Sequence, residues 1–218
     1  MDGYELPEGV AVRDPHPTAR EAPYTYFLPD PQELAALRPG DWIKVVFDQT
    51  EDEAECPAER MWIRIEAIAG GEVFGRLDNL PEEISRLKRG DPVRAPICHA
   101  IDIDFGADHV PPSVPPRREY WDRCLVDRCV LDGSSPVDYL YREAPDATRQ
   151  ADEFPDSGWC LRGTEQAVAR DEARGVRPCY VALGAVLNRD DRWLPLIDRE
   201  VGSVFQWSEA AGAFVEVD

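Results

Sequence analysis

Six side chains that can ligate a metal ion or transfer a proton lie close together in the sequence. They are Cys98, His99, Asp102, Asp104, Asp108 and His109. In a strand over 98–104, Cys98, Asp102 and Asp104 would share one face, while His99 would point to the other. One row of acids does not enclose an ion unless Asp108 and His109 fold back over it, and a structural zinc site needs four nitrogen or sulfur ligands. We therefore expect a solvated strand edge here and no bound metal.

Nucleophilic catalysis needs a serine or cysteine that is activated by a histidine and oriented with the help of an acid. The chain has three histidines, and His16 lies among prolines. Asp156-Ser157-Gly158-Trp159 lacks the strand–serine–helix context of a nucleophile elbow. Carboxylate pairs are too common in this acidic chain to indicate glycosidase chemistry, and no phosphate-binding or dinucleotide motif is present. We predict that the protein is not an enzyme and needs no cofactor.

The chain of 218 residues carries a formal net charge of −19, from 43 acidic and 24 basic residues. Such a surface repels nucleic acid and anionic membranes and attracts a basic protein, although many cytoplasmic proteins are acidic without such a partner. No apolar run is long enough for a membrane helix, and the N-terminus lacks the pattern of a signal peptide. We expect a cytoplasmic protein whose six cysteines are reduced and mostly buried.

Prolines divide the chain into segments. Residues 1–30 hold five prolines and are expected to form an irregular arm, and residues 111–118 hold four and are expected to form a linker. Between them we predict a β-rich domain over 31–110. A mixed α+β domain is expected over 119–218, so the predicted fold class is α+β.

Strands dominate the prediction for 31–110. We expect them over 42–47, 61–68, 73–77 and 93–103, the last interrupted by Pro96, with one helical turn over 81–87. Alternation over 61–68 places Met61, Ile63 and Ile65 on one face and Trp62, Arg64 and Glu66 on the other. Gly70-Gly71 is expected to turn that strand back as a hairpin. Two similar five-residue segments each place a Gly-Asp turn before a strand. They are Leu37-Arg-Pro-Gly-Asp41 and Leu87-Lys-Arg-Gly-Asp91.

The prediction for 119–218 mixes strands with a helix. A first hairpin is expected from 123–131 and 137–141, followed by a polar loop over 143–156 and a short strand at Trp159. Residues 164–174 have helix composition, with Thr164 as N-cap and Gly175 just past the end. Residues 180–187 are apolar and fit either a strand or a short helix. A last hairpin is expected from 202–207 and 213–217.

Four motifs in order suggest a relationship for residues 122–208. They are Tyr141-Arg142-Glu143-x-Pro145, Asp156-Ser-Gly-Trp159, Gly163-x-Glu165 and Pro195-Leu-Ile-Asp198. Their order resembles a family of small bacterial proteins, formerly a domain of unknown function, that is now grouped with the immunity proteins of polymorphic toxin systems. The resemblance implies a protein that binds and neutralises a toxin.

Residues 33–104 resemble a second, uncharacterised bacterial domain family. The motifs are Gly40-Asp-x-Ile-Lys-Val45, Glu59-Arg-Met-Trp62, Gly75-Arg-Leu-Asp-Asn79 and Leu87-Lys-Arg-Gly-Asp91. This resemblance implies a small, strongly curved antiparallel sheet. The complete expectation is thus a curved antiparallel β domain followed by a mixed α+β domain.

Two surfaces are candidates for binding a basic toxin or another protein. One is an acidic loop with Glu51, Asp52, Glu53 and Glu55, which is equally typical of a solvated loop tip. The other consists of Tyr141, Arg142, Glu143, Asp156 and Trp159, because Tyr, Trp and Arg dominate interface energetics. The alternative for the second set is that Tyr141 and Trp159 pack in the core while Arg142 pairs with Asp156.

We hypothesise a non-enzymatic, acidic immunity protein that neutralises a toxin by direct binding, with neither nucleic acid nor a membrane as partner. The competing hypothesis is a housekeeping or regulatory protein that binds a small ligand or a cellular protein through its β domain.

Overall fold

The computed structural model describes residues 3–49 and 58–217. The chain forms two compact units, each with its own sheet. Unit 1 comprises residues 1–21 and 26–117, and unit 2 comprises residues 22–25 and 118–218. The predicted α+β class, with a curved antiparallel sheet followed by a mixed sheet with helices, is confirmed. None of the helices in the described ranges is long and apolar enough to cross a membrane.

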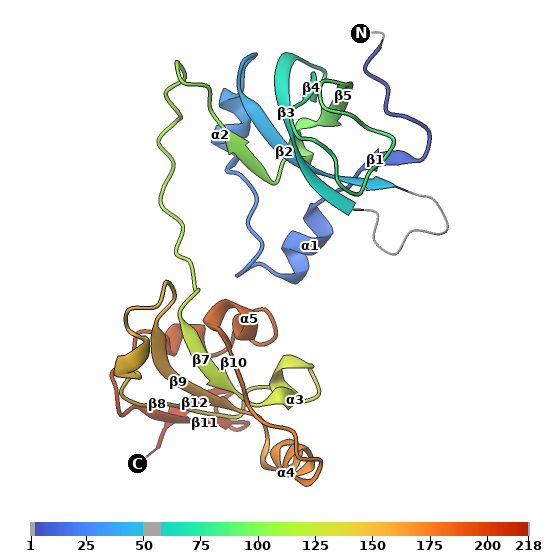
Figure 1. Cartoon of the computed structure of the whole chain (residues 1–218). Helices are drawn as coiled ribbons and strands as arrows, with labels where there is room; N and C mark the ends of the chain where they lie inside the picture. Colours follow the sequence, from blue (N-terminus) through green and yellow to red (C-terminus); the bar gives the residue numbers. More distant parts are fainter. Residues whose placement is uncertain (1–2, 50–57, 218) are drawn as a thin grey trace. The chain divides into compact units, whose positions relative to one another are not determined.

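Unit 1 is built on sheet A, whose strands follow the order β1-β2-β3-β4-β5, with β6 also paired to β2 (Figure 1). All of these pairings are antiparallel, and the sheet nearly closes on itself. The strands are β1 (Val10–Val12), β2 (Trp42–Gln49), β3 (Ala58–Ala69), β4 (Glu72–Leu77), β5 (Pro92–Pro96) and β6 (Asp102–Asp104). The helical elements are α1 (His16–Glu21), α2 (Pro31–Ala36) and the 3-10 turn η1 (Ile97–His99).

The alternation predicted for 61–68 is confirmed in β3. Met61, Ile63 and Ile65 are buried in the core of unit 1, whereas Arg64 and Glu66 are exposed on the outside of the sheet. Gly70 and Gly71, both with positive φ, connect β3 to β4 as the expected hairpin. Period-two alternation therefore determined which side of this sheet faces the core.

Other parts of unit 1 differ from expectation. The arm is not wholly irregular, because β1 adds to the edge of β2 and α1 follows it. No helix forms over 81–87, and the strand predicted over 93–103 is divided into β5, η1 and β6. Pro96 ends β5 because it has no N–H to continue the ladder.

Unit 2 is built on sheet B, whose strands follow the order β10-β7-β9-β8-β11-β12. β7 and β9 are parallel, and the other pairs are antiparallel. The strands are β7 (Arg123–Val126), β8 (Tyr139–Arg142), β9 (Asp156–Arg162), β10 (Cys179–Ala182), β11 (Val204–Ser208) and β12 (Ala213–Glu216). The helical elements are α3 (Arg128–Leu131), α4 (Glu165–Ala173), α5 (Leu183–Leu187), η2 (Ala147–Arg149) and η3 (Leu194–Leu196).

The expected hairpin from 123–131 and 137–141 is wrong. β7 ends at Val126, the chain continues into α3, and β9 lies between β7 and β8. Residues 157–161 of β9 are all buried, which is typical of a central strand. Asp127, which is buried directly after β7, accepts hydrogen bonds from the Arg162 side chain at the end of β9 and from the Gly163 N–H.

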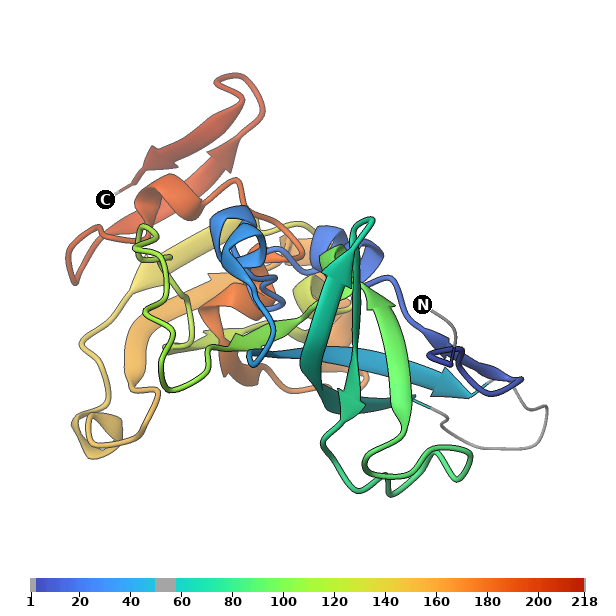
Figure 2. The same ribbon diagram turned by 90° about the horizontal axis from the view of Figure 1, so that it is seen from above.

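The remaining expectations for unit 2 hold more closely. The last hairpin is confirmed as β11 and β12, which lie beside the C-terminus and are drawn in red in Figure 2. The helix expected over 164–174 is α4, although Thr164 makes no side-chain cap and instead donates its N–H to the Ser135 hydroxyl. Residues 180–187 contain both expected alternatives, since β10 leads directly into α5.

Sheet B has one face in the core and one outer face. The core face and the helices share a cluster that contains Cys124, Trp159 and Leu161 of the sheet and Val130 and Val186 of the helices. On the outer face, the strand registers align one row of side chains across five strands. This outer row is Tyr180, Leu125, Cys160, Tyr141 and Val204. The loop after β8, with η2, covers only one end of this face, because Arg149 stacks on Tyr180 there.

Candidate functional site

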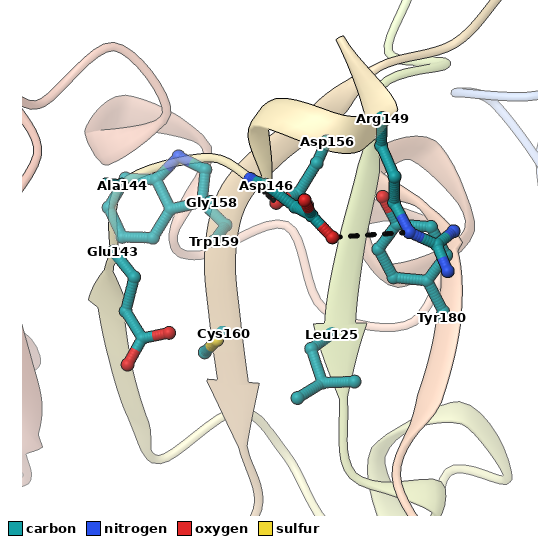
Figure 3. Close-up of a pocket in the computed structure, with 10 residues that line it drawn as sticks. All are labelled: Leu125, Glu143, Ala144, Asp146, Arg149, Asp156, Gly158, Trp159, Cys160 and Tyr180. Atoms are coloured by element: carbon teal, nitrogen blue, oxygen red, sulfur yellow. Dashed lines mark hydrogen bonds and ion pairs between the residues drawn. The ribbon is translucent and has the colours of Figure 1, made fainter. Parts of the chain in front are cut away.

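A pocket of about 300 Å³ lies on the outer face of sheet B, beside the outer row. Strands β7, β9 and β10 form one side of it, and the loop after β8 forms the other (Figure 3). We call it the acidic pocket; its lining residues are Leu125, Glu143, Ala144, Asp146, Arg149, Asp156, Gly158, Trp159, Cys160 and Tyr180. Three of the predicted site residues, Glu143, Asp156 and Trp159, are therefore brought together.

The Asp-Ser-Gly-Trp motif builds the floor of the acidic pocket. Trp159 is 1% exposed, its indole N–H donates to the Ile197 carbonyl at 3.1 Å, and its ring lies 6.1 Å from that of Trp193. Trp159 is thus a core residue that only borders the pocket. The Ser157 hydroxyl donates to the Arg123 carbonyl at 2.7 Å, which fixes β9 against β7.

Gly158 allows β9 to approach the backbone of Glu143, the residue directly after β8. Its φ is +76°, and the Glu143 N–H donates to its carbonyl at 2.8 Å. A Cβ at this position would lie 2.1 Å from the Glu143 carbonyl oxygen. Only glycine fits such an approach, so the motif is required for the shape of the pocket.

Arg142 and Tyr141 flank the pocket without lining it. The Arg142 guanidinium donates to the carbonyls of Ser157 at 3.0 Å and Arg199 at 2.7 Å. The local pairing of Arg142 with Asp156 that the sequence suggested does not form between these two described residues; Arg142 donates to the two carbonyls instead. Tyr141 is half-buried in the outer row beside Cys160, and burial raises the pKa of its hydroxyl to about 12.

Three carboxylates and one guanidinium give the acidic pocket its charge. Asp156 accepts the Asp146 N–H at 2.8 Å, and Asp146 lies 3.7 Å from Arg149. Hydrogen bonds from the Thr148 hydroxyl and N–H hold the pKa of Asp146 below its usual value. Glu143 is exposed and has no ion pair within the described part of the chain. At neutral pH the pocket carries a net negative charge.

The lining combines one thiol with carboxylates and exposed apolar side chains. Cys160 is the only nucleophilic thiol in the lining, and burial raises its pKa, so the thiolate is disfavoured. No histidine belongs to the lining residues to activate it. What the pocket offers is an exposed apolar surface, Leu125 at 41% and Tyr180 at 36%, next to carboxylates.

Several of these residues were missed in the sequence. Leu125 and Tyr180 are directly opposed in β7 and β10, and Leu125 is aligned with Cys160 through the parallel pairing of β7 with β9. The one sequence signal that could have identified Leu125 is the alternation of Cys124, Leu125 and Val126, because it places Leu125 alone on the outer side of the sheet. The acidic stretch with Glu51, Asp52, Glu53 and Glu55 lies outside the described residues.

The residues over 98–109 that could ligate a metal or transfer a proton contact different partners and so lie apart. Asp102 pairs with Lys44 at 2.9 Å, and His99 lies 3.9 Å from Asp14. Among residues 3–49 and 58–217, no three His, Cys, Asp or Glu side chains gather as a metal site would require.

His109 instead helps to hold a buried carboxylate. Its Nδ1 lies 2.8 Å from Asp41, which is 1% exposed and also accepts the backbone N–H groups of Arg38 and Gly106. Burial acts to raise the pKa of Asp41, but these hydrogen bonds outweigh it, so the pKa is lowered. This cluster stabilises the Gly40-Asp41 turn.

Two parts of the sequence match the models of known protein families. Residues 124–218 match the family model of the Immunity protein Imm33 domain. Residues 31–108 match a second model, described as an uncharacterized protein conserved in bacteria (DUF2314). Both resemblances inferred from the motifs are thereby confirmed. Searches of the curated proteins and of the solved structures gave no match.

The acidic pocket lies entirely within the Imm33 match. Its lining runs from Leu125 to Tyr180, and no lining residue comes from unit 1. The match supports an immunity-protein role for the C-terminal half of the chain.

Proposed function

We propose that this protein is an immunity protein that neutralises a toxin by binding it directly, and that the outer face of sheet B makes the contact. The observation that carries the proposal is that the Imm33 match contains two exposed apolar side chains, Leu125 and Tyr180, in the lining of a negatively charged pocket. The protein would act without catalysis, in the cytoplasm, by covering a surface that the toxin needs.

The apolar part of the contact is the outer row. Leu125 and Tyr180 are opposed across β7 and β10, and Arg149 stacks on the Tyr180 ring with 4.4 Å between the guanidinium carbon and the ring centre. Interfaces derive most of their affinity from a few aromatic, arginine and apolar side chains that a partner can desolvate. A rigid sheet presents these side chains with little loss of conformational entropy on binding.

The charged part of the contact selects the partner. Glu143, Asp146 and Asp156 lie at the pocket, and the chain as a whole has a net charge of −19. Charges at the rim of an interface mainly govern association rate and salt sensitivity. The surface therefore fits a toxin whose exposed apolar side chains are flanked by lysine and arginine.

The experiment first asks whether toxin domains are encoded beside this gene in its host and takes each one found as a candidate partner. Co-expression with the protein should restore growth in the presence of one of these toxins, and the purified pair should form a complex measurable by calorimetry. Leu125→Ala and Tyr180→Ala should each weaken that complex about thirtyfold or more, because truncating a hot-spot residue costs about 2 kcal/mol or more.

Charge reversal tests the acidic pocket separately. Glu143→Lys should slow association several-fold at low ionic strength, and the effect should shrink as salt is added. Glu200→Lys is the matched control, because Glu200 is also exposed in unit 2 but does not line the pocket. Equal effects of the two reversals, or full toxin protection by the Leu125 and Tyr180 variants together, would reject this surface.

The acidic stretch that includes Glu51 and Glu55 stays a separate prediction. Reversing Glu51, Asp52, Glu53 and Glu55 to lysine should slow association with the same toxin if this stretch also contacts it. An unchanged rate and salt dependence would remove the stretch from the interface.

A further inference from the structure

A second pocket, of about 450 Å³, lies in unit 1 and collects three arginines. It sits over the paired strands β3 and β4 and is bordered by two turns at Gly40 and Gly90. We call it the arginine pocket; its lining residues are Gly40, Arg64, Ile65, Glu66, Arg76, Leu77, Asp78, Arg89 and Gly90. In an acidic chain, a pocket with this many cations calls for an explanation.

The two turns are formed by the two similar sequence segments, Leu37–Asp41 and Leu87–Asp91. In each, the glycine has positive φ, +100° at Gly40 and +89° at Gly90. Each aspartate accepts the backbone N–H three residues earlier at 2.8 Å, Asp41 from Arg38 and Asp91 from Lys88.

The same turns are also tied to the strands in the same way. The Gly40 N–H donates to the carbonyl of Ile65 in β3, and the Gly90 N–H donates to the carbonyl of Leu77 in β4. The two similar sequence segments thus form the same kind of turn, and both turns border a single pocket.

Arg64 and Arg76 are directly opposite each other across β3 and β4. Like charges in this position destabilise a sheet, so packing alone does not favour them. Arg76 lies 3.2 Å from Glu66, and Arg89 lies 2.8 Å from Asp78. The Arg64 guanidinium has neither a hydrogen bond nor an ion pair within the described ranges and lies over the Trp42 ring at 5.5 Å.

The two carboxylates of the pocket are already bound by neutral donors. The Tyr4 hydroxyl donates to Glu66 at 2.7 Å, and the Trp42 indole N–H donates to Asp78 at 3.0 Å. Arg76 and Arg89 use only part of their five N–H donors on these carboxylates, so other guanidinium N–H groups remain available. Three guanidiniums against two carboxylates give the pocket a net charge of about +1 at neutral pH.

We propose that the arginine pocket binds a small dianion, a phosphomonoester or a dicarboxylate, with Arg64 as its principal contact. Guanidinium groups bind phosphate and carboxylate oxygens through paired N–H donors, and the contact with the Trp42 ring restricts where the Arg64 guanidinium can lie. The net charge of −19 disfavours a long polyanion, whereas a small dianion meets mainly the local charge. This proposal is independent of toxin binding and gives the β unit a ligand site of its own.

The test titrates the full-length protein with three probes at constant ionic strength: inorganic phosphate, phenyl phosphate and succinate. Tryptophan fluorescence and calorimetry measure binding, because Trp42 contacts both Arg64 and Asp78. We expect a dissociation constant in the millimolar range or tighter for at least one probe. Binding of the two phosphates alone assigns a phosphate ligand, and binding of succinate alone assigns a dicarboxylate.

Arg64→Gln should weaken the binding about tenfold or more, as expected when charge-assisted hydrogen bonds are lost. Arg94→Gln is the matched control, because Arg94 is exposed on β5 and does not line the pocket. It should bind within about twofold of the parent, since it removes the same charge elsewhere. Absence of binding for all three probes, or equal weakening by the two variants, would overturn the proposal. Circular dichroism of Arg64→Gln shows whether a loss reflects unfolding, and Arg64→Lys then repeats the test with the charge retained.

Discussion

Gly158 is the position where one added methyl group should disturb unit 2 most informatively. Its φ is +76°, and a Cβ would lie 2.1 Å from the Glu143 carbonyl oxygen and 3.3 Å from the Pro145 nitrogen. Both are backbone atoms, so no side chain can rotate away. Gly175 is the matched control, because its φ is +70° and a Cβ there would have nothing within 4 Å.

Gly158→Ala and Gly175→Ala both place alanine at a positive φ, but only Gly158→Ala also creates a steric clash. Alanine in the left-handed region costs about 1–2 kcal/mol at either position. At Gly158 the clash must also move β9 away from Glu143, and overpacking of this kind costs about 1–3 kcal/mol. The Glu143 N–H to Gly158 carbonyl bond, 2.8 Å long, would be lost or stretched, which adds about 1 kcal/mol. Gly158→Ala should therefore destabilise unit 2 by roughly 2–4 kcal/mol more than Gly175→Ala does.

Urea unfolding measures this difference directly. Four of the six tryptophans lie in unit 2, and Trp159 and Trp193 are fully buried there, so their fluorescence reports its unfolding. The transition of unit 1, followed by amide exchange at β2 and β3, should not move. Equal midpoints for the two alanine variants would refute the close approach of β9 to Glu143.

Two further predictions concern buried side chains. Trp159→Ala should lower the free energy of unfolding of unit 2 by roughly 3–5 kcal/mol, because Trp159 is 1% exposed and packs against Trp193. A stable Trp159→Ala protein that no longer binds its toxin would instead place Trp159 in the interface. Asp41→Asn should lower the melting temperature of unit 1 at neutral pH, because the folded pKa of Asp41 lies below its unfolded value of 3.8. Such a carboxylate stabilises the fold above pH 3.8 and loses this effect as the pH falls through the folded pKa, so the difference between variant and parent should shrink in acid. A difference that stays constant from neutral pH into acid would contradict this assignment.

Local patterns in the sequence were sufficient for two of the three predicted hairpins, β3–β4 and β11–β12. Clean alternation defined β3, Gly70-Gly71 defined its turn, and the last hairpin followed from two short apolar runs. In each case the residues that decide the structure are close neighbours in the chain, so period and turn chemistry contain the necessary information.

The topology of sheet B could not be obtained in this way. Asp127, directly after β7, pairs with Arg162, which lies 35 positions later at the end of β9, and β9 pairs with β7 in parallel. The acidic pocket depends on that pairing, since it brings Leu125 next to Cys160. The motif residues Glu143, Asp156 and Trp159 were found because they lie within one loop and the strand after it, whereas Tyr180 belongs to the far edge strand.

The acidic pocket and the arginine pocket have opposite charge, and this makes each a control for the other. Glu143→Lys adds positive charge to unit 2, so it should slow toxin association and leave dianion affinity in unit 1 unchanged. Arg64→Gln removes positive charge from unit 1, so it should weaken the dianion and leave toxin association unchanged. General changes in net charge would instead alter both measurements together, because long-range attraction depends on the summed charge of the chain. If Arg64→Gln weakens toxin binding only when the dianion is present, the two sites are coupled, and the ligand of unit 1 regulates the immunity function of unit 2.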